Sequence, residues 1–236
     1  LVEFNNCKLV NGNLTSDIKV RDIGKYKYKD IRLKEQYLII SDNTAESIIN
    51  KVINKSELRM DLGDVSINPF NIGTDFEDSE IYSEDKPIAV IKSGDRTTYT
   101  SESNITKNYD IISKYKVCVG KLSGEHGGIA AEGKQANVIS NPFILLPNQV
   151  CTGTYVVIGV FNTLERAENM VAYMKTKFTR YLISVTISGM HISTRNYMFV
   201  PIQDYSKPWT DLELYDKYGL SKYEIELIEN KIKQME

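Results

Sequence analysis

The apolar residues in the second half of this chain change period at about residue 163, and that change limits the fold more than any other feature. Two largely apolar runs, residues 138–146 and 152–160, predict strands, and Pro147-Asn148 between them predicts a turn. Beyond Thr163 the apolar residues recur at helical spacing: Ala167, Met170, Val171, Met174, Phe178, Tyr181, Leu182 and Val185. The fold must therefore pack a sheet against at least one helix.

Shorter elements are expected in the first half. Residues 4–10 and 14–20 flank Asn11-Gly12, a dipeptide that accommodates the positive φ angles of a tight hairpin turn. Further strands are expected at residues 36–41, 87–92 and 116–120, a turn at residues 93–96, and helices at residues 44–54 and 106–115. The helix at 44–54 has Asp42 or Asn43 as its expected cap, and its apolar face is formed by Ile48, Ile49, Val52 and Ile53.

The C-terminal part predicts a last strand at residues 197–202 and then a helical tail. Thr210 or Asp211 can cap a short helix, and Ser221 with Glu224 forms a capping box that opens a helix to residue 236. Strands and helices do not alternate regularly along the chain. The sequence therefore predicts an α+β fold, with a mixed sheet, peripheral helices and a C-terminal helical tail.

Composition describes a folded, water-soluble protein. The 236 residues are 42% hydrophobic and 25% charged, and no apolar run approaches the roughly 20 residues that a membrane-spanning helix needs. There is also no secretory signal segment, so we expect a cytoplasmic protein without a membrane partner. Cys7, Cys118 and Cys151 are odd in number and widely spaced, which favours reduced core cysteines over disulfides or a zinc site.

Charge is distributed unevenly along the chain. The net charge is −2, yet residues 133–203 hold six basic and only two acidic residues. A basic block within an acidic chain is typical of a surface that faces phosphate. The acids of this block are Glu165 and Glu168, and its bases are Lys134, Arg166, Lys175, Lys177, Arg180 and Arg195.

The last third carries the most specific motif. The tail reads Phe199-Val200-Pro201-Ile202-Gln203-Asp204-Tyr205-Ser206-Lys207-Pro208-Trp209-Thr210-Asp211. Upstream of it stand Pro69, Phe70, Gly73, Thr74 and Phe76, then Lys116 and Val117, then Pro142 and Phe143, then Cys151, Thr152, Thr154 and Tyr155. From about residue 36 onward this pattern resembles the C-terminal target recognition region of type IIG restriction-modification adenine-specific DNA methyltransferases.

The chain also departs from that family's pattern. Asn71-Ile72-Gly73 replaces a Gly-Leu pair, and Asp75 stands where the family usually has asparagine. The glycine-rich segment at residues 123–128 differs as well, as a specificity loop would if the chain reads a different target.

The resemblance implies a division of labour within a longer polypeptide. Residues 1–35 would be the end of an upstream methyltransferase domain or its junction, and residues 36–236 the target recognition domain. The first residue is Leu, which fits a piece of a longer protein. Double-stranded DNA and the N-terminal methyltransferase domain would be the partners. S-adenosylmethionine would bind in that absent domain. Whether an endonuclease is fused to the same polypeptide is a question that the resemblance leaves open.

Catalytic chemistry is not apparent in the chain itself. Amino-methyltransferases need an Asn/Asp-Pro-Pro-aromatic loop, and both Asn68-Pro69-Phe70 and Asn141-Pro142-Phe143 lack the second proline. His126 and His191 are the only histidines, and neither has the neighbours of a metal site or a catalytic triad. We therefore expect no catalytic, cofactor-binding or metal-binding residue here.

DNA contacts are expected from basic residues of two kinds. Lys92, which closes a strand, and Arg96, which should project from the turn after it, are expected to contact DNA, and the planar fork of Arg96 can read a guanine edge. Phosphate contacts are expected from Lys121, Lys134, Lys175, Lys177, Arg180 and Arg195. The alternative is a protein interaction or scaffold module, in which residues 207–236 pack on a partner and the basic block is incidental.

Overall fold

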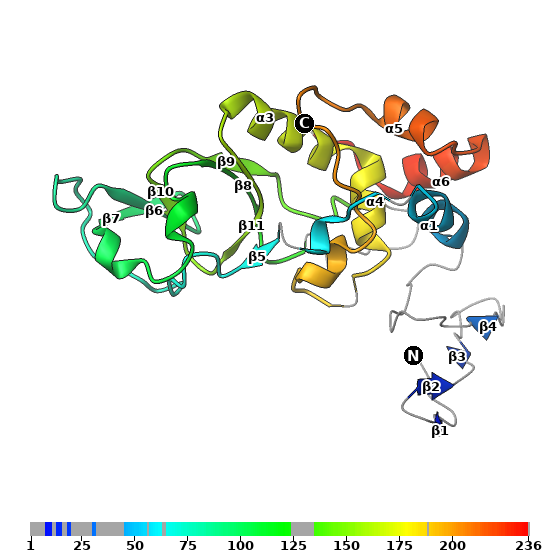
Figure 1. Cartoon of the computed structure of the whole chain (residues 1–236), viewed down its shortest axis with the longest axis horizontal. Helices are drawn as coiled ribbons and strands as arrows, with labels where there is room; N and C mark the ends of the chain where they lie inside the picture. The colour runs from blue at the N-terminus through cyan, green and yellow to red at the C-terminus, as the bar shows by residue number, and fades with distance from the viewer. Residues whose placement is uncertain are drawn as a thin grey trace.

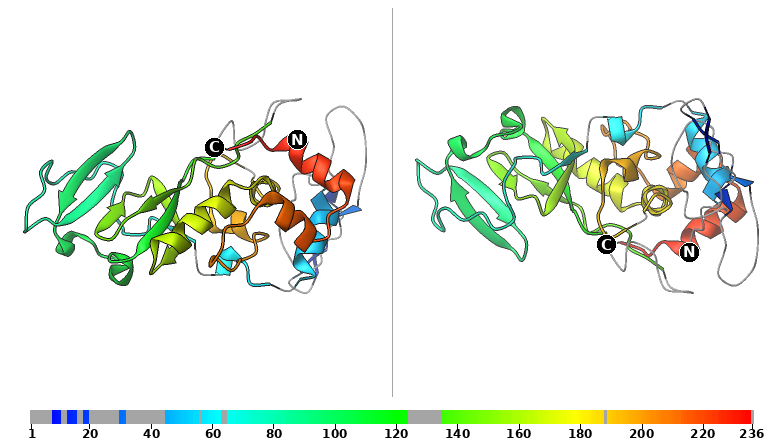
Figure 2. Two further views of the ribbon diagram at one scale, coloured as in Figure 1. Left: turned by 90° about the horizontal axis from the view of Figure 1, so that it is seen from above. Right: turned by 90° about the horizontal axis from the view of Figure 1, so that it is seen from below.

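The computed structural model describes residues 8–10, 13–15, 18–19, 30–31, 45–55, 57–62, 65–123, 135–187 and 189–235. Two sheets occupy one end of the molecule, and most of the helices are gathered at the other end (Figure 1). The views from above and below show the same separation (Figure 2). The α+β class predicted from the sequence is confirmed.

A four-stranded antiparallel sheet lies between the helices and the second sheet. Its order is β5 (Ser66–Ile67), β11 (Tyr155–Phe161), β8 (Tyr115–Gly120) and β9 (Phe143–Leu145). Alternate residues of a strand point to opposite faces of the sheet, so one strand can contribute side chains to two hydrophobic cores. Val117, Val119 and Val156 join the core shared with the helices, whereas Cys118 and Val157 join the core shared with the second sheet.

The second sheet is mixed, and it covers the other face of the central sheet. Its order is β10 (Gln149–Cys151), β6 (Ile88–Lys92) and β7 (Arg96–Thr100), with β10 parallel to β6 and β7 antiparallel to it. Val90 and Val150 face each other in register and are fully buried. The predicted strand at 87–92 and the turn after it are confirmed, although Arg96 already belongs to β7.

The two strands predicted at 138–146 and 152–160 are shorter than expected. Only Phe143–Leu145 is extended in the first run, and the second begins at Tyr155 after a separate strand, β10. The break falls at Thr152, whose amide donates to the carbonyl of Ile91, and Gly153, whose amide donates to Ile72. These bonds tie the chain to the second sheet before it returns to the first.

Helix α3 (Leu164–Lys175) packs against the helix-facing side of the central sheet, with Thr163 at its N-cap. A Cβ built on Gly159 of β11 would overlap the side chain of Met170, so glycine allows this close approach. The helical stripe does not continue unbroken, because Thr176 is extended and its hydroxyl caps a new helix, α4 (Lys177–Ser184). Sequence periodicity misses this break because the apolar spacing continues across it.

The remaining helices complete the helical end. They are α1 (Glu46–Ile53), α5 (Asp211–Lys217) and α6 (Lys222–Lys231). The caps at Thr210 and Ser221 are confirmed as capping boxes, but α6 ends at Lys231 rather than at residue 236. Ile53 is 37% exposed rather than part of the buried face of α1. Asp42 and Asn43 lie outside the described residues.

Two predicted elements are wrong and are replaced by single turns of 3-10 helix. Residues 106–114 form only η4 (Tyr109–Ile111), which follows Asn108 with a positive φ of 56°, and Tyr115 already belongs to β8. Residues 197–202 form no strand, since the chain leaves η5 (Thr194–Tyr197) and makes only an isolated bridge between Pro201 and Arg59. Two further turns are η2 (Met60–Leu62) and η3 (Glu102–Asn104).

Near the N-terminus, β1 (Lys8–Val10) pairs with β2 (Asn13–Thr15) in antiparallel register, as the predicted hairpin requires. A second short pair joins β3 (Ile18–Lys19) to β4 (Asp30–Ile31). The strand predicted at residues 36–41 lies outside the described residues. Among the helices that are described, none combines the length and the apolar character needed to cross a bilayer.

Candidate nucleic-acid interface

Two of the basic residues predicted to contact DNA are buried. Lys92 is 2% exposed, and its ammonium donates to the carbonyl of Phe76 at 2.6 Å and pairs with Glu77. Arg180 is fully buried. Neither charge lies on a surface that DNA could reach, so both predictions are corrected.

Arg180 stabilises the junction between α3 and α4. Its Nη2 and Nε donate to the carbonyl of Lys175 at 2.9 and 3.2 Å, and Nε also approaches the carbonyl of Thr176 at 3.3 Å. A helix leaves its last carbonyls without partners inside the helix, and Arg180 supplies donors there, although the carbonyl of Thr176 also accepts the main-chain amide of Arg180 at 3.3 Å. Burial lowers the pKa of Arg180 to about 10, partly opposed by Asp211, so the guanidinium stays charged at neutral pH. Its remaining donor, Nη1, lies 3.4 Å from the carbonyl of Asn137.

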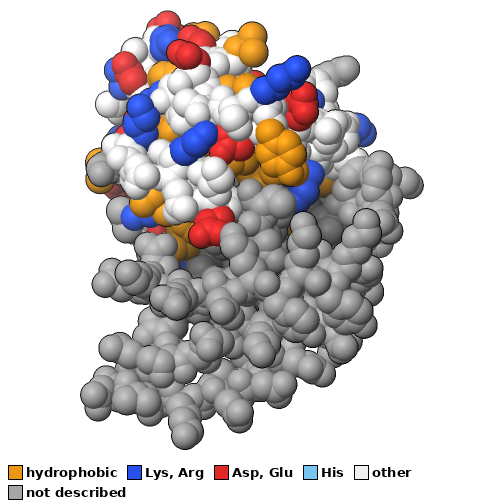
Figure 3. All heavy atoms as spheres, turned by 90° about the vertical axis from the view of Figure 1, so that its right-hand side faces the viewer, with side chains coloured by type: hydrophobic (Ala, Val, Ile, Leu, Met, Phe, Trp, Pro, Cys, Tyr) orange, Lys and Arg blue, Asp and Glu red, His pale blue; other side chains and the backbone are white. Residues whose placement is uncertain are grey.

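The α3–α4 face as a whole is not an open basic surface. The ammonium of Lys177 pairs with Glu229 of α6, which also accepts a hydrogen bond from the hydroxyl of Tyr215 at 2.9 Å. Lys175 is half-buried. On the helical end of the molecule, basic and acidic side chains are interspersed (Figure 3). The sequence predicts three phosphate contacts here, whereas the packing favours a structural role for these residues.

Arg96 is exposed near the tip of the β6–β7 hairpin, where its Nε approaches the carbonyl of Ser93 at 3.3 Å. Its surroundings in the sequence are acidic, because residues 71–110 hold nine acidic and four basic residues. Repulsion between these carboxylates and phosphate would oppose docking of DNA on this end. Exposure alone therefore does not make Arg96 a base-reading residue.

Lys121 and Arg195, in contrast, belong to segments without acids, and main-chain pairing joins residues 121–123 to residues 190–192, just before Arg195. The amide of Ile192 donates to the carbonyl of Lys121 at 2.8 Å, and the amide of Ser123 donates to the carbonyl of Met190 at 2.8 Å. Residues 111–123 and 169–203 contain no Asp or Glu. The surface formed by Lys121, Leu122, Ser123, His191 and Arg195 is called the Lys121 surface below. Lys134 lies outside the described residues.

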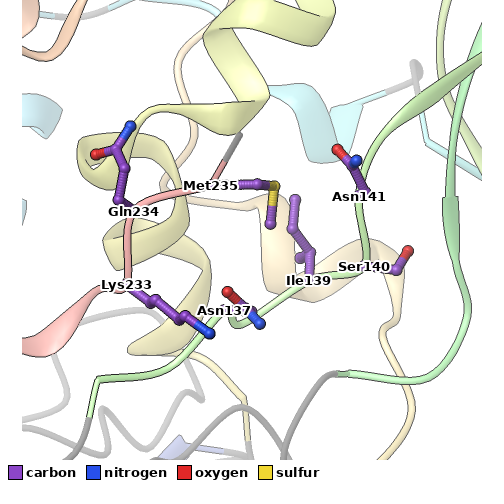
Figure 4. A pocket seen from close by; sticks show the side chains of 7 residues that line it. All are labelled: Asn137, Ile139, Ser140, Asn141, Lys233, Gln234 and Met235. Carbon is purple, nitrogen blue, oxygen red and sulfur yellow. The ribbon is translucent and has the colours of Figure 1, made fainter.

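A pocket of about 450 Å³ adjoins the Lys121 surface (Figure 4). The two are joined where the amide of Gly120 donates to the hydroxyl of Ser140 at 2.6 Å. The described residues that line the pocket are mainly polar, and none of them carries a carboxylate: Asn137, Ile139, Ser140, Asn141, Lys233, Gln234 and Met235. It is called the polar pocket below.

One wall of the polar pocket is a strained turn. The amide of Ile139 donates to the carbonyl of Asn137 at 2.9 Å, and Val138 between them has a φ of 71°. This is a γ-turn of the rare positive-φ form, and a β-branched residue adopts it only where the surroundings enforce it. Val138 is fully buried, and Nη1 of Arg180 donates to the carbonyl of Asn137 at 3.4 Å.

The other wall is the end of the chain. The amide of Ala136 donates to the carbonyl of Lys231, and the amide of Lys233 donates to the carbonyl of Ala136, both at 2.9 Å. The side-chain amide of Gln135 also donates to the carbonyl of Glu229 at 2.8 Å. These bonds join segments about 95 residues apart in the sequence, so no local pattern could have predicted the pocket.

The tail motif that carries the family resemblance has a packing role in this structure. Both carboxylate oxygens of Asp211 accept main-chain amides at the start of α4, from Phe178 at 2.8 Å and Lys177 at 3.1 Å. The indole of Trp209 donates to the carbonyl of Asp204 at 2.9 Å, and the ammonium of Lys207 lies 4.3 Å from its ring centre. The motif therefore fastens the tail to the helical end.

No protein-family model matches the chain, and none of the curated proteins compared with it is significantly similar. Within the described part of the chain, no group of three or more His, Cys, Asp or Glu side chains could hold a metal ion.

Proposed function

We propose that this chain is the sequence-specific DNA recognition domain of a cytoplasmic restriction-modification adenine methyltransferase. It would dock on duplex DNA through the Lys121 surface and hold the duplex for an N-terminal methyltransferase domain of the same polypeptide, where S-adenosylmethionine would bind. One observation carries the proposal: surface cations and side-chain amides lie on neighbouring surfaces, to which residues 111–123, 135–141 and 169–203 contribute no acids.

The two kinds of side chain would have different tasks. Lys121 and Arg195 can contact phosphates, and such contacts supply affinity without sequence information. Asn137 and Asn141 carry amides, the groups that pair with adenine edges through two hydrogen bonds. A surface that offers both can hold a duplex and distinguish its bases.

A mobility-shift titration of the whole chain with mixed duplexes, over a series of salt concentrations, tests the proposal. The Lys121→Ala/Arg195→Ala variant should weaken binding to every duplex and reduce the slope of log K against log salt by about 0.9 for each phosphate that is no longer neutralised. Lys107→Ala/Lys222→Ala, which removes two exposed lysines elsewhere, is the matched control. A wild-type chain that binds no duplex at low salt would refute the proposal.

A protein interaction module is the second candidate, and the acidic end of the molecule favours it. Ile81 is 76% exposed and Tyr82 is 58% exposed, with the ring of Tyr82 packed edge-on against Tyr99 at 5.9 Å. Such apolar side chains among acids could face a basic protein partner. The same titration separates the two functions, because a protein-binding module would show no salt-dependent affinity for DNA.

A further inference from the structure

We propose that the polar pocket binds one unstacked nucleotide of the bound DNA, with the base inside the pocket and its phosphate near Lys233. This inference rests on the proposed function, because the duplex supplies the nucleotide. It adds a binding site within the recognition domain itself, where the resemblance implies only docking and reading of paired bases.

The lining has the composition that an extruded base requires. Enzymes that hold such a base stack it against apolar side chains and bond its edge with polar ones. In Figure 4 the side chain of Met235 points toward that of Ile139, giving an apolar wall, and the side chain of Lys233 extends toward Asn137. A methionine sulfur makes favourable contacts with aromatic rings. The volume of about 450 Å³ lies within the range of roughly 300–1,000 Å³ found for small-molecule sites.

The polar groups of the pocket are available to a ligand. Among the described residues, no hydrogen-bond partner is found for the side chains of Asn137, Asn141, Lys233 or Gln234. Ser140 is the exception, since its hydroxyl accepts the amide of Gly120. Among the described residues, the lining holds a lysine and no carboxylate, which favours an anionic ligand over a cation. A nucleotide provides that anion together with a planar ring and a hydrogen-bonding edge.

The pocket is also held in one shape before any ligand arrives. The γ-turn at Val138 fixes Asn137 and Ile139, Arg180 supports the turn, and the main-chain bonds to Ala136 fix the opposite wall. A rigid pocket loses little entropy on binding, which is the usual advantage of a preformed site. The strain at Val138 would thus be maintained for binding rather than for the fold alone.

Three probes test the inference: an intact duplex, the same duplex with one extrahelical 2-aminopurine, and free deoxynucleoside monophosphates. The extrahelical base has already lost its stacking, so the wild-type chain should bind that duplex at least about 10-fold more tightly than the intact one. Burial of the 2-aminopurine should also change its fluorescence. The Lys233→Ala/Gln234→Ala variant, which changes two side chains of the pocket lining, should lose the preference while still binding the intact duplex.

Asn162→Ala/Lys222→Ala is the matched control, because both residues are exposed and lie outside the pocket. It should retain the preference. Equal affinity for both duplexes would overturn the inference but leave the proposed function standing, as would a preference that survives in the pocket variant. Binding of free nucleotides in the pocket without a preference for the extrahelical base would also overturn it. A chain that binds neither duplex would overturn the proposed function itself.

Discussion

Replacement of Arg180 by Met gives the sharpest test of how the polar pocket is supported. Methionine keeps an apolar side chain of similar reach in this fully buried position and removes the guanidinium. The carbonyl of Lys175 then loses its side-chain donors, whereas the carbonyls of Asn137 and Thr176 still accept the main-chain amides of Ile139 at 2.9 Å and of residue 180 at 3.3 Å.

The expected cost follows from these groups. A buried carbonyl left without a donor costs about 1 to 3 kcal/mol, and only the carbonyl of Lys175 is left in that state, because the carbonyl of Asn137 keeps the amide of Ile139 at 2.9 Å. Removal of a buried cation offsets part of this loss, because burial disfavours the charge and lowers the pKa of Arg180 to about 10. We therefore expect the variant to lose about 1 to 2 kcal/mol of unfolding free energy, and its melting temperature to fall by roughly 2 to 8 °C.

Thermal unfolding followed by circular dichroism measures this loss, and Arg195→Met is the matched control because Arg195 is exposed. The control should melt within about 2 °C of the wild-type chain, as expected for a surface change. If Arg180→Met melts as the wild type does but binds DNA with a reduced salt slope, the guanidinium contacts phosphate and the structural assignment fails.

Three further outcomes follow. Gly159→Ala should cost about 1 to 3 kcal/mol, because its Cβ would overlap Met170, and a Met170→Ala background should reduce that cost in a double-mutant cycle measured by urea unfolding. Burial alone would raise the pKa of Glu224, but its hydrogen bonds, that from Lys51 foremost, lower this pKa to about 2. The stability that Glu224 contributes should therefore be present above pH 4.5 and be lost as the pH falls toward 2. Glu224→Gln should flatten that loss in unfolding curves measured over this pH range. Lys177→Met should leave the slope of log K against log salt for DNA binding unchanged, because Lys177 is already paired with Glu229. A slope lowered by about one would instead show that Lys177 contacts a phosphate.

Local patterns predicted local features of the fold well. The strand at β6, the buried strand at β8 and the capping boxes at Thr210 and Ser221 all depend on residues close in the sequence. The break at Thr176 and the divided strand at Thr152 were missed. Both depend on hydrogen bonds to the neighbouring backbone or to another sheet, which apolar spacing does not register.

The candidate site was harder to predict because a sequence pattern does not distinguish a buried cation from an exposed one. Lys92, Lys116 and Arg180 are all buried, and each donates to main-chain carbonyls. Lys116, for example, donates to the carbonyls of Lys114 at 2.6 Å and Ile112 at 2.8 Å. The polar pocket was missed for a different reason, since its two walls meet only through tertiary pairing.

Hydrogen exchange of the whole chain, with and without a bound duplex, tests the proposed DNA interface most directly. We predict slower exchange on DNA binding at residues 120–123, 135–141 and 190–195, which form the Lys121 surface and the wall of the polar pocket. The β6–β7 hairpin and helices α5 and α6 should exchange as in the unbound chain. Protection confined to the hairpin, or to the exposed side of α5 and α6, would contradict the proposed interface.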